Sequence, residues 1–297
     1  DIGIPPEAEF IVGPGDLRVV TKKRPAASHK GDFGKILVIG GGGGKFYSGA
    51  PALAGLAALR TGVDLVNIAA PSSISNVVRS YSPDLIVRDL PGDYLSKNVI
   101  EPLEKLIKWA SGVIIGPGLG LHPDTLEAIL IILEKIHALR IPVLVDADAI
   151  KAMAENNTIL SGVPAVITPH FGEYEILTGI DLSKIKDSHE RLRTVQNSAK
   201  ELGITLLVKG REDFISDGIY AKINRTGTPA MTCGGSGDVL AGVVGCLLGQ
   251  NYSPFRSANA GAFINGLAGE LAEKKYYGPH IIASDLIDFI PKAMYLE

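Results

Sequence analysis

The stretch of the chain best suited to chemistry combines flexible backbone with a carboxylate: Thr232-Cys-Gly-Gly-Ser-Gly-Asp-Val-Leu-Ala-Gly242. Its glycines can turn the backbone tightly and point several N–H groups the same way. The apolar segment 239–249 follows, and it predicts a buried helix whose N-terminus adds partial positive charge. Such a terminus binds anions, most simply phosphate. The sequence therefore predicts an anion hole formed by Gly234, Gly235, Ser236 and Gly237.

Asp238 stands where an anion is expected, which is electrostatically unfavourable unless the carboxylate takes part in the reaction. It could accept a proton from a hydroxyl group that then attacks a phosphoryl group. The alternative is an ordinary glycine-rich loop in which Asp238 caps the helix. Cys233, in the same stretch, is interpreted as a small space-filling residue rather than a nucleophile.

Two further groups of polar residues follow short apolar runs. His170 and Glu173 are three residues apart, so both can face one side of a helix. Glu173 could contact a magnesium–phosphate complex through water, or it could bond backward to the backbone in a capping box. The segment Lys209-Gly-Arg-Glu-Asp213 could contact nucleotide phosphates or ribose, and its alternative is a surface turn.

Asp146 and Asp148 also follow an apolar run. Because alternate residues of a strand face opposite ways, these carboxylates are not expected to form one catalytic pair. Asp146 could hold a metal or a substrate hydroxyl, and Asp148 could cap the next helix.

Two glycine-rich loops complete the set of candidate binding elements. Gly40–Gly44 is no dinucleotide fingerprint, because no acidic residue ends the next predicted strand, and no P-loop, because Phe46 follows Lys45. We interpret it as a loop that brings backbone close to a flat or bulky ligand, with Tyr47 and Ala50 lining it. Gly116-Pro-Gly-Leu-Gly120 is either a second such loop or a plain turn.

These loops alternate with apolar segments in a repeated strand, turn and helix pattern. The short apolar run 36–39 predicts a buried parallel strand, and further strands are predicted at 63–69, 113–115, 142–145, 165–168 and 205–208. Periodic segments predict helices at 50–59, 125–139 and 188–202. The pattern predicts an α/β fold with ligands at the carboxyl ends of the strands. We expect one domain over residues 25–297, preceded by a leader or linker over residues 1–24.

Composition limits the classes of partner. Of the 297 residues 46% are hydrophobic, and the mean hydropathy of +0.22 allows a sizeable core. The net charge of −3, with a single short basic run at 21–24, argues against nucleic acid as the main partner. Neither a signal peptide nor a membrane span is visible. The two cysteines make no metal-type pair, and the low count suits the cytoplasm.

Taken in order, the motifs resemble the ADP- or ATP-dependent NAD(P)H-hydrate dehydratases of the ribokinase-like superfamily, from about residue 25 to the C-terminus. The resemblance rests on these segments: His29-Lys-Gly-Asp-Phe-Gly34, Ile36-Leu-Val-Ile-Gly-Gly41, Tyr47-Ser-Gly-Ala-Pro51, Gly116-Pro-Gly118, Asp146-Ala-Asp-Ala149, Thr168-Pro-His170 with Glu173, Lys209-Gly210, 224–231 and Gly234-Gly-Ser-Gly-Asp238. It implies a three-layer fold, with helices on both faces of a mostly parallel sheet.

The resemblance also implies a repair reaction, in which a hydrated NADH or NADPH, the (S)-epimer, loses its water at the expense of a nucleotide phosphoryl group. Asp238 would be the catalytic base. The hydrate would lie near Ala50, Gly118, His170 and Asp238. The adenine nucleotide, ADP or ATP with Mg²⁺, would lie near Lys209, Gly210, Arg211, Glu212, Asp213 and Gly237. Relatives often end the Lys-Gly motif in threonine, so Asp213 is a departure.

The family further implies a homo-oligomer, often a tetramer, and in many relatives an epimerase domain upstream, whose end residues 1–9 resemble. Two alternatives share the anion hole and Asp238. One is a small-molecule kinase of the same fold, acting on a vitamin precursor or sugar and releasing a stable phosphorylated product. The other is a nucleotide-binding module without turnover.

Overall fold

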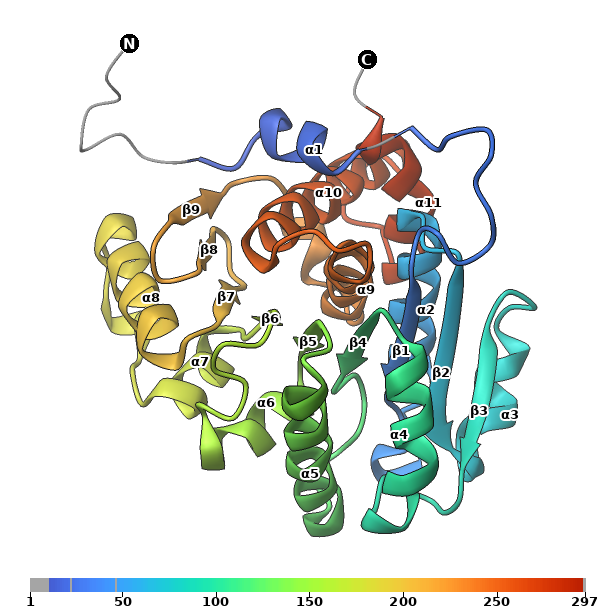
Figure 1. Ribbon diagram of the computed structural model, residues 1–297. Helices are drawn as coiled ribbons and strands as arrows, with labels where there is room; N and C mark the ends of the chain where they lie inside the picture. Colours follow the sequence, from blue (N-terminus) through green and yellow to red (C-terminus); the bar gives the residue numbers. More distant parts are fainter. Residues whose placement is uncertain (1–10, 22, 46, 296–297) are drawn as a thin grey trace.

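The computed structural model describes residues 11–295 except Lys22 and Phe46, so the expected end of an upstream domain at residues 1–9 lies outside the described residues. A nine-stranded sheet in the order β3-β2-β1-β4-β5-β6-β7-β8-β9 runs through the described molecule (Figure 1). The strands are β1 Lys35–Ile39, β2 Leu65–Pro71, β3 Ile86–Leu90, β4 Gly112–Ile115, β5 Val143–Val145, β6 Ala165–Ile167, β7 Thr205–Val208, β8 Asp213–Ser216 and β9 Ala221–Asn224.

The sheet is parallel from β3 to β7, and β8 and β9 add an antiparallel edge. The prediction of a mostly parallel sheet is therefore confirmed. The strand order reverses between β1 and β4, because the chain first builds outward through β2 and β3 and then continues on the other side of β1. In open α/β sheets, ligands bind outside the carboxyl ends of the strands at such a reversal.

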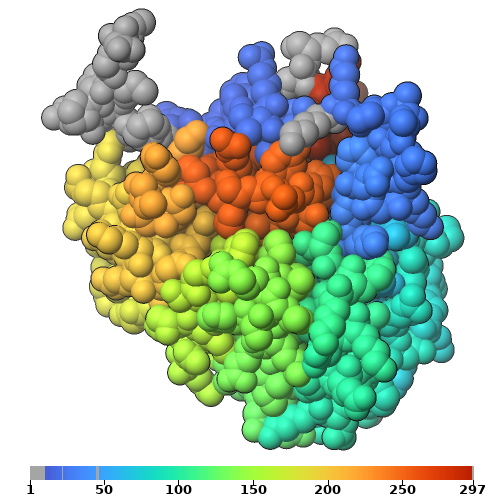
Figure 2. Space-filling view, in the orientation of Figure 1, coloured from blue at the N-terminus to red at the C-terminus, as the bar shows by residue number. Residues whose placement is uncertain are grey.

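Helices cover both faces of the sheet, as the resemblance predicts. One face carries α1 Pro14–Val20, α2 Gly49–Thr61, α3 Ser72–Ser80, α9 Ser236–Gly249, α10 Pro254–Lys275 and α11 Ala283–Met294. The other carries α4 Ile100–Trp109, α5 Pro123–Leu139, α6 Asp148–Met153, α7 Phe171–Thr178 and α8 Ser188–Leu202. Figure 2 shows residues of the α4–α5 region (green) below those of α10 (orange).

Strand residues alternate between the two cores, as the pleat requires. In β1, for example, Ile36 and Val38 join the core under α2 and α9, while Leu37 and Ile39 join the core under α4 and α5. Among the described residues, none of the helices is both long and apolar enough to cross a bilayer.

Helix α9 is buried along most of its length, and glycine lets its neighbours approach. A Cβ at Gly242 would lie 2.2 Å from the Ala54 carbonyl oxygen of α2, and one at Gly245 would lie 2.4 Å from a side-chain carbon of Ile114 in β4. Because α9 is wedged between α2 and the sheet, its N-terminus is fixed relative to the strand ends.

Part of the segment 1–24, which we predicted to be a leader or linker, packs against the domain. Helix α1 packs against α10 with Leu17 and Val20 buried. Asp16 accepts a 2.7 Å bond from Lys222 of β9, and Ile11 forms a bridge with Ile223. Amphipathicity over so short a helix gives too weak a signal to distinguish a docked segment from a linker.

Candidate active site

The predicted glycine-rich anion hole lies at the N-terminus of α9. Gly235 is the N-cap residue and has φ 94°, a left-handed conformation that favours glycine. Its added Cβ would lie 2.7 Å from Leu53 of α2. The Ser236 hydroxyl donates to the Cys233 carbonyl at 3.1 Å, so its backbone N–H, rather than its hydroxyl, is the group suited to an anion. The first N–H groups of a helix have no partner within it.

Asp238 is half-buried in the first turn of this helix. Its carboxylate is not the N-cap, since Gly235 takes that position without a side-chain cap. The capping alternative is therefore wrong, and the carboxylate is available for chemistry.

A buried ion pair lies beside Asp238. Lys209, immediately after β7, donates from Nζ to Asp146 Oδ1 at 2.7 Å, and the Thr168 hydroxyl donates to the same oxygen at 2.8 Å. Asp146 follows β5 and is only 2% exposed. A Cβ placed on Gly237 would lie 3.6 Å from Lys209 Nζ, so the ammonium group borders the predicted anion hole.

Carboxylates surround the Lys209 ammonium group. Burial alone would lower the pKa of Lys209, but the surrounding charges outweigh burial and raise it above its ordinary value. The acidic neighbours responsible are Asp146, Glu173 and Asp238. Lys209 therefore stays cationic, which suits a phosphoryl group in transfer.

The surroundings of Asp238 disfavour its charged form. Burial is the largest cause that raises the pKa of Asp238, Asp146 and Asp148 also raise it, and Lys209 lowers it; the net result is a pKa of about 7. A carboxyl group with this pKa can accept a proton near neutral pH and remains a stronger base than an ordinary aspartate.

Asp146 and Asp148 bond to different partners, and both raise the pKa of Asp238. Ala147 between them has φ 51° and ψ −123°, which L-residues rarely adopt. Asp148 accepts from the Gly120 N–H at 2.8 Å and from Lys151 at 3.0 Å, and it is not the N-cap of α6, so its expected capping role is wrong.

The variant Asp146→Asn should shift the pH dependence of the reaction. Asparagine keeps an oxygen for Lys209 and Thr168 but removes the charge that helps raise the pKa of Asp238. The acidic limb of the profile of kcat/KM against pH should move to lower pH. Asp148→Asn should move it in the same direction by less, and an unmoved or raised limb in Asp146→Asn would contradict the assignment.

His170 and Glu173 form the capping box that was the alternative to a metal role. The His170 N–H donates to Glu173 Oε2 at 2.9 Å, and the Glu173 N–H donates to His170 Nδ1 at 3.2 Å. The His170 side chain is 61% exposed, whereas that of Glu173 is 6% exposed. The Glu173 carboxylate also lies near Lys209, where its negative charge helps to raise the pKa of the ammonium group.

A large cavity of about 780 Å³ opens beside Lys209, at the carboxyl ends of β6 and β7. Its lining includes the predicted residues His170, Lys209, Gly210, Arg211 and Glu212. His170, predicted to lie near the hydrate, thus lines the same cavity as the predicted nucleotide residues.

Asp213 differs from its neighbours, because it begins β8 and turns inward. It accepts from Asn224 at 2.9 Å and from the Gly210 N–H at 3.1 Å, and burial raises the pKa of Asp213 to about 6. It holds the turn and is not among the residues that line the cavity.

Five residues that line the cavity were not predicted from the sequence: Phe171, Gly172, Lys186, Ser188 and Arg191. The Arg191 guanidinium lies 5.3 Å from the centre of the Phe171 ring, and Ser188 donates to Glu212 at 2.5 Å. The i, i+3 spacing of Ser188 and Arg191 was visible, but the sequence does not show where α8 docks.

Ala50 and Gly118 lie together at the other side of the α9 N-terminus. A Cβ at Gly118, which has φ 68°, would lie 3.3 Å from the Ala50 Cβ and 2.9 Å from the Tyr47 Cβ. Ala50 is one turn before Leu53, the α2 residue that abuts Gly235. Helix α2 therefore joins this pair to the anion hole.

The two glycine loops pack against each other. The Gly41 N–H donates to the Pro117 carbonyl at 2.8 Å, and the Gly43 N–H donates to that of Gly118 at 3.0 Å. The close approach expected of Gly40–Gly44 is thus made in part to the second loop.

Comparison with known proteins identifies the family of the chain. Residues 36–292 match the family model described as NAD(P)H-hydrate dehydratase. A bifunctional NAD(P)H-hydrate repair enzyme from Pyrobaculum aerophilum is 45% identical over 293 residues, which cover 99% of this chain and 57% of that protein. An ADP-dependent (S)-NAD(P)H-hydrate dehydratase from Cenarchaeum symbiosum is 38% identical over 97% of both chains. The chain thus spans little more than half the length of the bifunctional relatives it matches.

Solved structures share the fold. A ribokinase-like superfamily protein from Enterococcus faecalis has a TM-score of 0.82 at 24% identity, over 99% of this chain and 98% of that one. An ADP/ATP-dependent NAD(P)H-hydrate dehydratase from Bacillus subtilis, co-crystallized with ATP/Mg²⁺, has a TM-score of 0.78 at 22% identity, over 97% and 98%. With its ordered motifs and its ribokinase-like fold, the chain belongs to the NAD(P)H-hydrate dehydratase family.

Proposed function

We propose that this protein dehydrates the (S)-epimer of hydrated NADH or NADPH, with ADP or ATP as phosphoryl donor. The observation that carries the proposal is the half-buried Asp238 carboxylate in the first turn of α9, next to free helix N–H groups and the Lys209 ammonium group. A base, an anion hole and a fixed cation are the parts that phosphoryl transfer to a hydroxyl requires. Family membership supports the choice of hydroxyl.

In the first step, Asp238 takes the proton of the ring hydroxyl, and the oxygen attacks the terminal phosphoryl group of the nucleotide. A new O–P bond forms as the bond to the departing nucleotide breaks. The amides of residues 234–237 stabilise the charge on the phosphoryl oxygens. In the second step, the ring nitrogen's lone pair expels the phosphate by breaking the C–O bond. Loss of a neighbouring ring proton then restores the dihydropyridine.

The nucleotide would occupy the cavity beside Lys209. Its lining carries four cationic side chains, Lys186, Arg191, Lys209 and Arg211, which suit a polyphosphate. Gly237 and Lys209 lie where this cavity meets the anion hole. Asp213 supports the turn of this wall through Gly210 and Asn224, and we assign it no direct contact.

The described residues suit a magnesium ion carried in by the nucleotide. They contain no group of three acidic, histidine or cysteine side chains that could hold a metal by themselves. Magnesium commonly keeps several waters and binds through substrate phosphates. Glu173, near Lys209, is the carboxylate we propose for contact through such a water. When bound, the ion would neutralise phosphate charge.

The family resemblance also leads to expectations about location, oligomeric state and domain organisation. We expect the enzyme in the cytoplasm, in keeping with its two free cysteines. We expect a homo-oligomer, by resemblance a tetramer. The bifunctional relatives make an epimerase domain in the native polypeptide a further expectation.

A kinetic trace tests the proposal. The protein is mixed with hydrated NADPH, magnesium and either ADP or ATP, and the near-ultraviolet absorbance of the dihydronicotinamide ring is followed. We expect a nucleotide-dependent rise, with free phosphate released in step. A stable phosphorylated product without the rise would instead support the small-molecule kinase.

A further inference from the structure

A second cavity of about 260 Å³ lies at the carboxyl ends of β1, β3 and β4. Its lining comprises Gly42, Gly43, Gly44, Asp93, Tyr94, Leu119, Gly120, Leu121 and His122. The rings of Tyr94 and His122 stack, with centroids 3.9 Å apart and an interplanar angle of 23°. Leu121, beside them, is 53% exposed and adds apolar surface to the cavity. The mechanism described above uses none of these side chains.

Hydrogen bonds tie both rings to one residue, Asp124. The Tyr94 hydroxyl donates to Asp124 Oδ2 at 3.2 Å, and His122 caps α5 by accepting at Nδ1 from the Asp124 N–H at 3.3 Å. The stacked pair, which we call the Tyr94–His122 platform, is therefore prebuilt. A flat ligand that stacks on it would lose little side-chain entropy.

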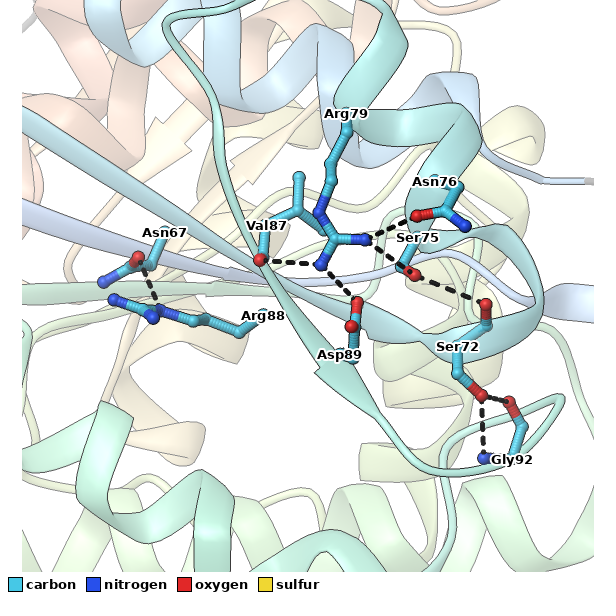
Figure 3. Close-up of polar contacts among 9 residues, drawn as sticks. All are labelled: Asn67, Ser72, Ser75, Asn76, Arg79, Val87, Arg88, Asp89 and Gly92. Carbon is cyan, nitrogen blue, oxygen red and sulfur yellow. Dashed lines mark hydrogen bonds and ion pairs between the residues drawn. The ribbon is translucent and has the colours of Figure 1, made fainter.

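The loop that carries Tyr94 is anchored in turn to β3 and α3 (Figure 3). Ser72 bonds both the carbonyl and the N–H of Gly92, at 3.1 and 3.2 Å. Arg79 ties α3 to β3 through the Val87 carbonyl at 3.2 Å and Asp89 at 2.5 Å. The edge of the sheet is thus fixed where the platform begins.

The platform cavity adjoins the proposed reaction site. It lies where the strand order reverses, between the loops that follow β1 and β4. Gly43 in its wall donates to the carbonyl of Gly118, which abuts Ala50. From β3, which leads to Tyr94, to β5, which leads to Asp146, there are four strand steps, or roughly 19 Å. A single extended dinucleotide can cover this distance.

The two cavities differ in chemistry. The cavity beside Lys209 is lined by four cationic side chains, whereas the platform cavity is lined by glycine backbone, leucines, the stacked rings and the acidic residue Asp93. The proposed reaction uses two adenine-containing molecules, a nucleotide and a dinucleotide hydrate. Polyphosphate suits the first cavity, and an uncharged purine suits the second.

We infer that the platform cavity binds the adenine end of the dinucleotide hydrate by stacking on the Tyr94–His122 platform. This inference rests on the proposed function. The hydrate then spans the sheet edge, with its nicotinamide ring at Asp238 and its adenine beside β3. The nucleotide occupies only the cavity beside Lys209.

The test compares a dinucleotide with its half in the intact protein. Binding of NADH and of reduced nicotinamide mononucleotide, which lacks the adenosine half, is measured by fluorescence in wild type and Tyr94→Ala. Turnover of the hydrates of these two molecules is measured with the same proteins. We expect wild type to prefer the dinucleotide in both assays. Tyr94→Ala should weaken the affinity for the dinucleotide by about 5- to 100-fold. The affinity for the mononucleotide and the KM for ADP or ATP should not change.

The control is Tyr220→Ala, on the exposed β8–β9 turn, which should change the affinity for neither ligand. Equal binding of both ligands by wild type, or an equal loss for both in Tyr94→Ala, would overturn the inference. If wild type turns over neither hydrate but binds NADH through Tyr94, the proposed function fails while the adenine site stands. If both hydrates react equally well in wild type and Tyr94→Ala, the proposed function stands and the adenine site fails.

Discussion

Asp238→Asn should lower turnover by about 10²–10⁴-fold, the range for loss of a positioned general base, while leaving nucleotide binding in place. Asparagine has the same shape but cannot take the hydroxyl proton. The variant keeps the N–H groups of α9 and the Lys209–Asp146 ion pair. In the proposed site, these groups bind the phosphoryl group. Steady-state kinetics and nucleotide titration on the same preparation measure both quantities.

The same variant should make the protein more stable at alkaline pH. Burial raises the pKa of Asp238 to about 7 from an ordinary value of 3.8, so the folded state favours the neutral carboxyl group. The wild type therefore loses stability as pH rises from about 4 through about 7, and asparagine does not. The free energy of unfolding of Asp238→Asn should exceed that of wild type above pH 7 by up to roughly 4 kcal/mol.

This advantage should shrink as pH falls toward 4, which thermal or urea unfolding at several pH values can check. Loss of activity together with loss of stability at pH 8 would mean that the aspartate supports the fold. Unchanged turnover in a folded variant would favour the nucleotide-binding module without turnover.

Gly116→Ala should have the largest effect on stability. Gly116 follows β4 with φ 127°, and an added Cβ would lie 1.7 Å from the backbone oxygen of Asp146. Neither atom can turn away as a flexible side chain could, so the ends of β4 and β5 must separate. The clash and the unfavourable φ together should cost roughly 3–5 kcal/mol of unfolding free energy. Because Asp146 anchors Lys209, turnover should fall in the molecules that remain folded.

Gly162→Ala is the matched control, since Gly162 also has a positive φ of 74° but would place its Cβ in open space. It should lose only about 1 kcal/mol and keep full activity. Equal losses in the two variants would show that the contact with Asp146 is unimportant. Urea unfolding of both proteins with wild type measures the difference.

The predictable parts of the fold were those with strong local patterns. The run Ile36–Ile39 is apolar throughout, and Thr205–Val208 is apolar after its first residue, because both faces of a central strand are covered, and β1 and β7 lie there. Strand β3 was missed because it is an edge strand, with exposed Arg88 and Asp89 in its middle. The α1 segment was missed because its few apolar residues match a linker as well as a helix that packs on α10.

In the site, too, only features with a local sequence pattern could be predicted. The motif ending in Asp238 predicted a helix N-terminus and a carboxylate, and both are present. The bond from Lys209 to Asp146 joins residues 63 positions apart, and no local spacing indicates it. The capping box of His170 and Glu173 was foreseen only as an alternative, because a carboxylate three residues into a helix suits a cap as well as a ligand. Tyr94 and His122 carry no motif, and only folding stacks them.

The most direct test of the central claim follows one oxygen atom. The hydrate is prepared in ¹⁸O-labelled water, so that its ring hydroxyl carries the label, and it is then turned over with ADP or ATP in ordinary water. If Asp238 directs that hydroxyl onto the phosphoryl group, the label should leave with the inorganic phosphate. Label found in water, with unlabelled phosphate, would contradict the account, because the hydroxyl would then have departed without being phosphorylated.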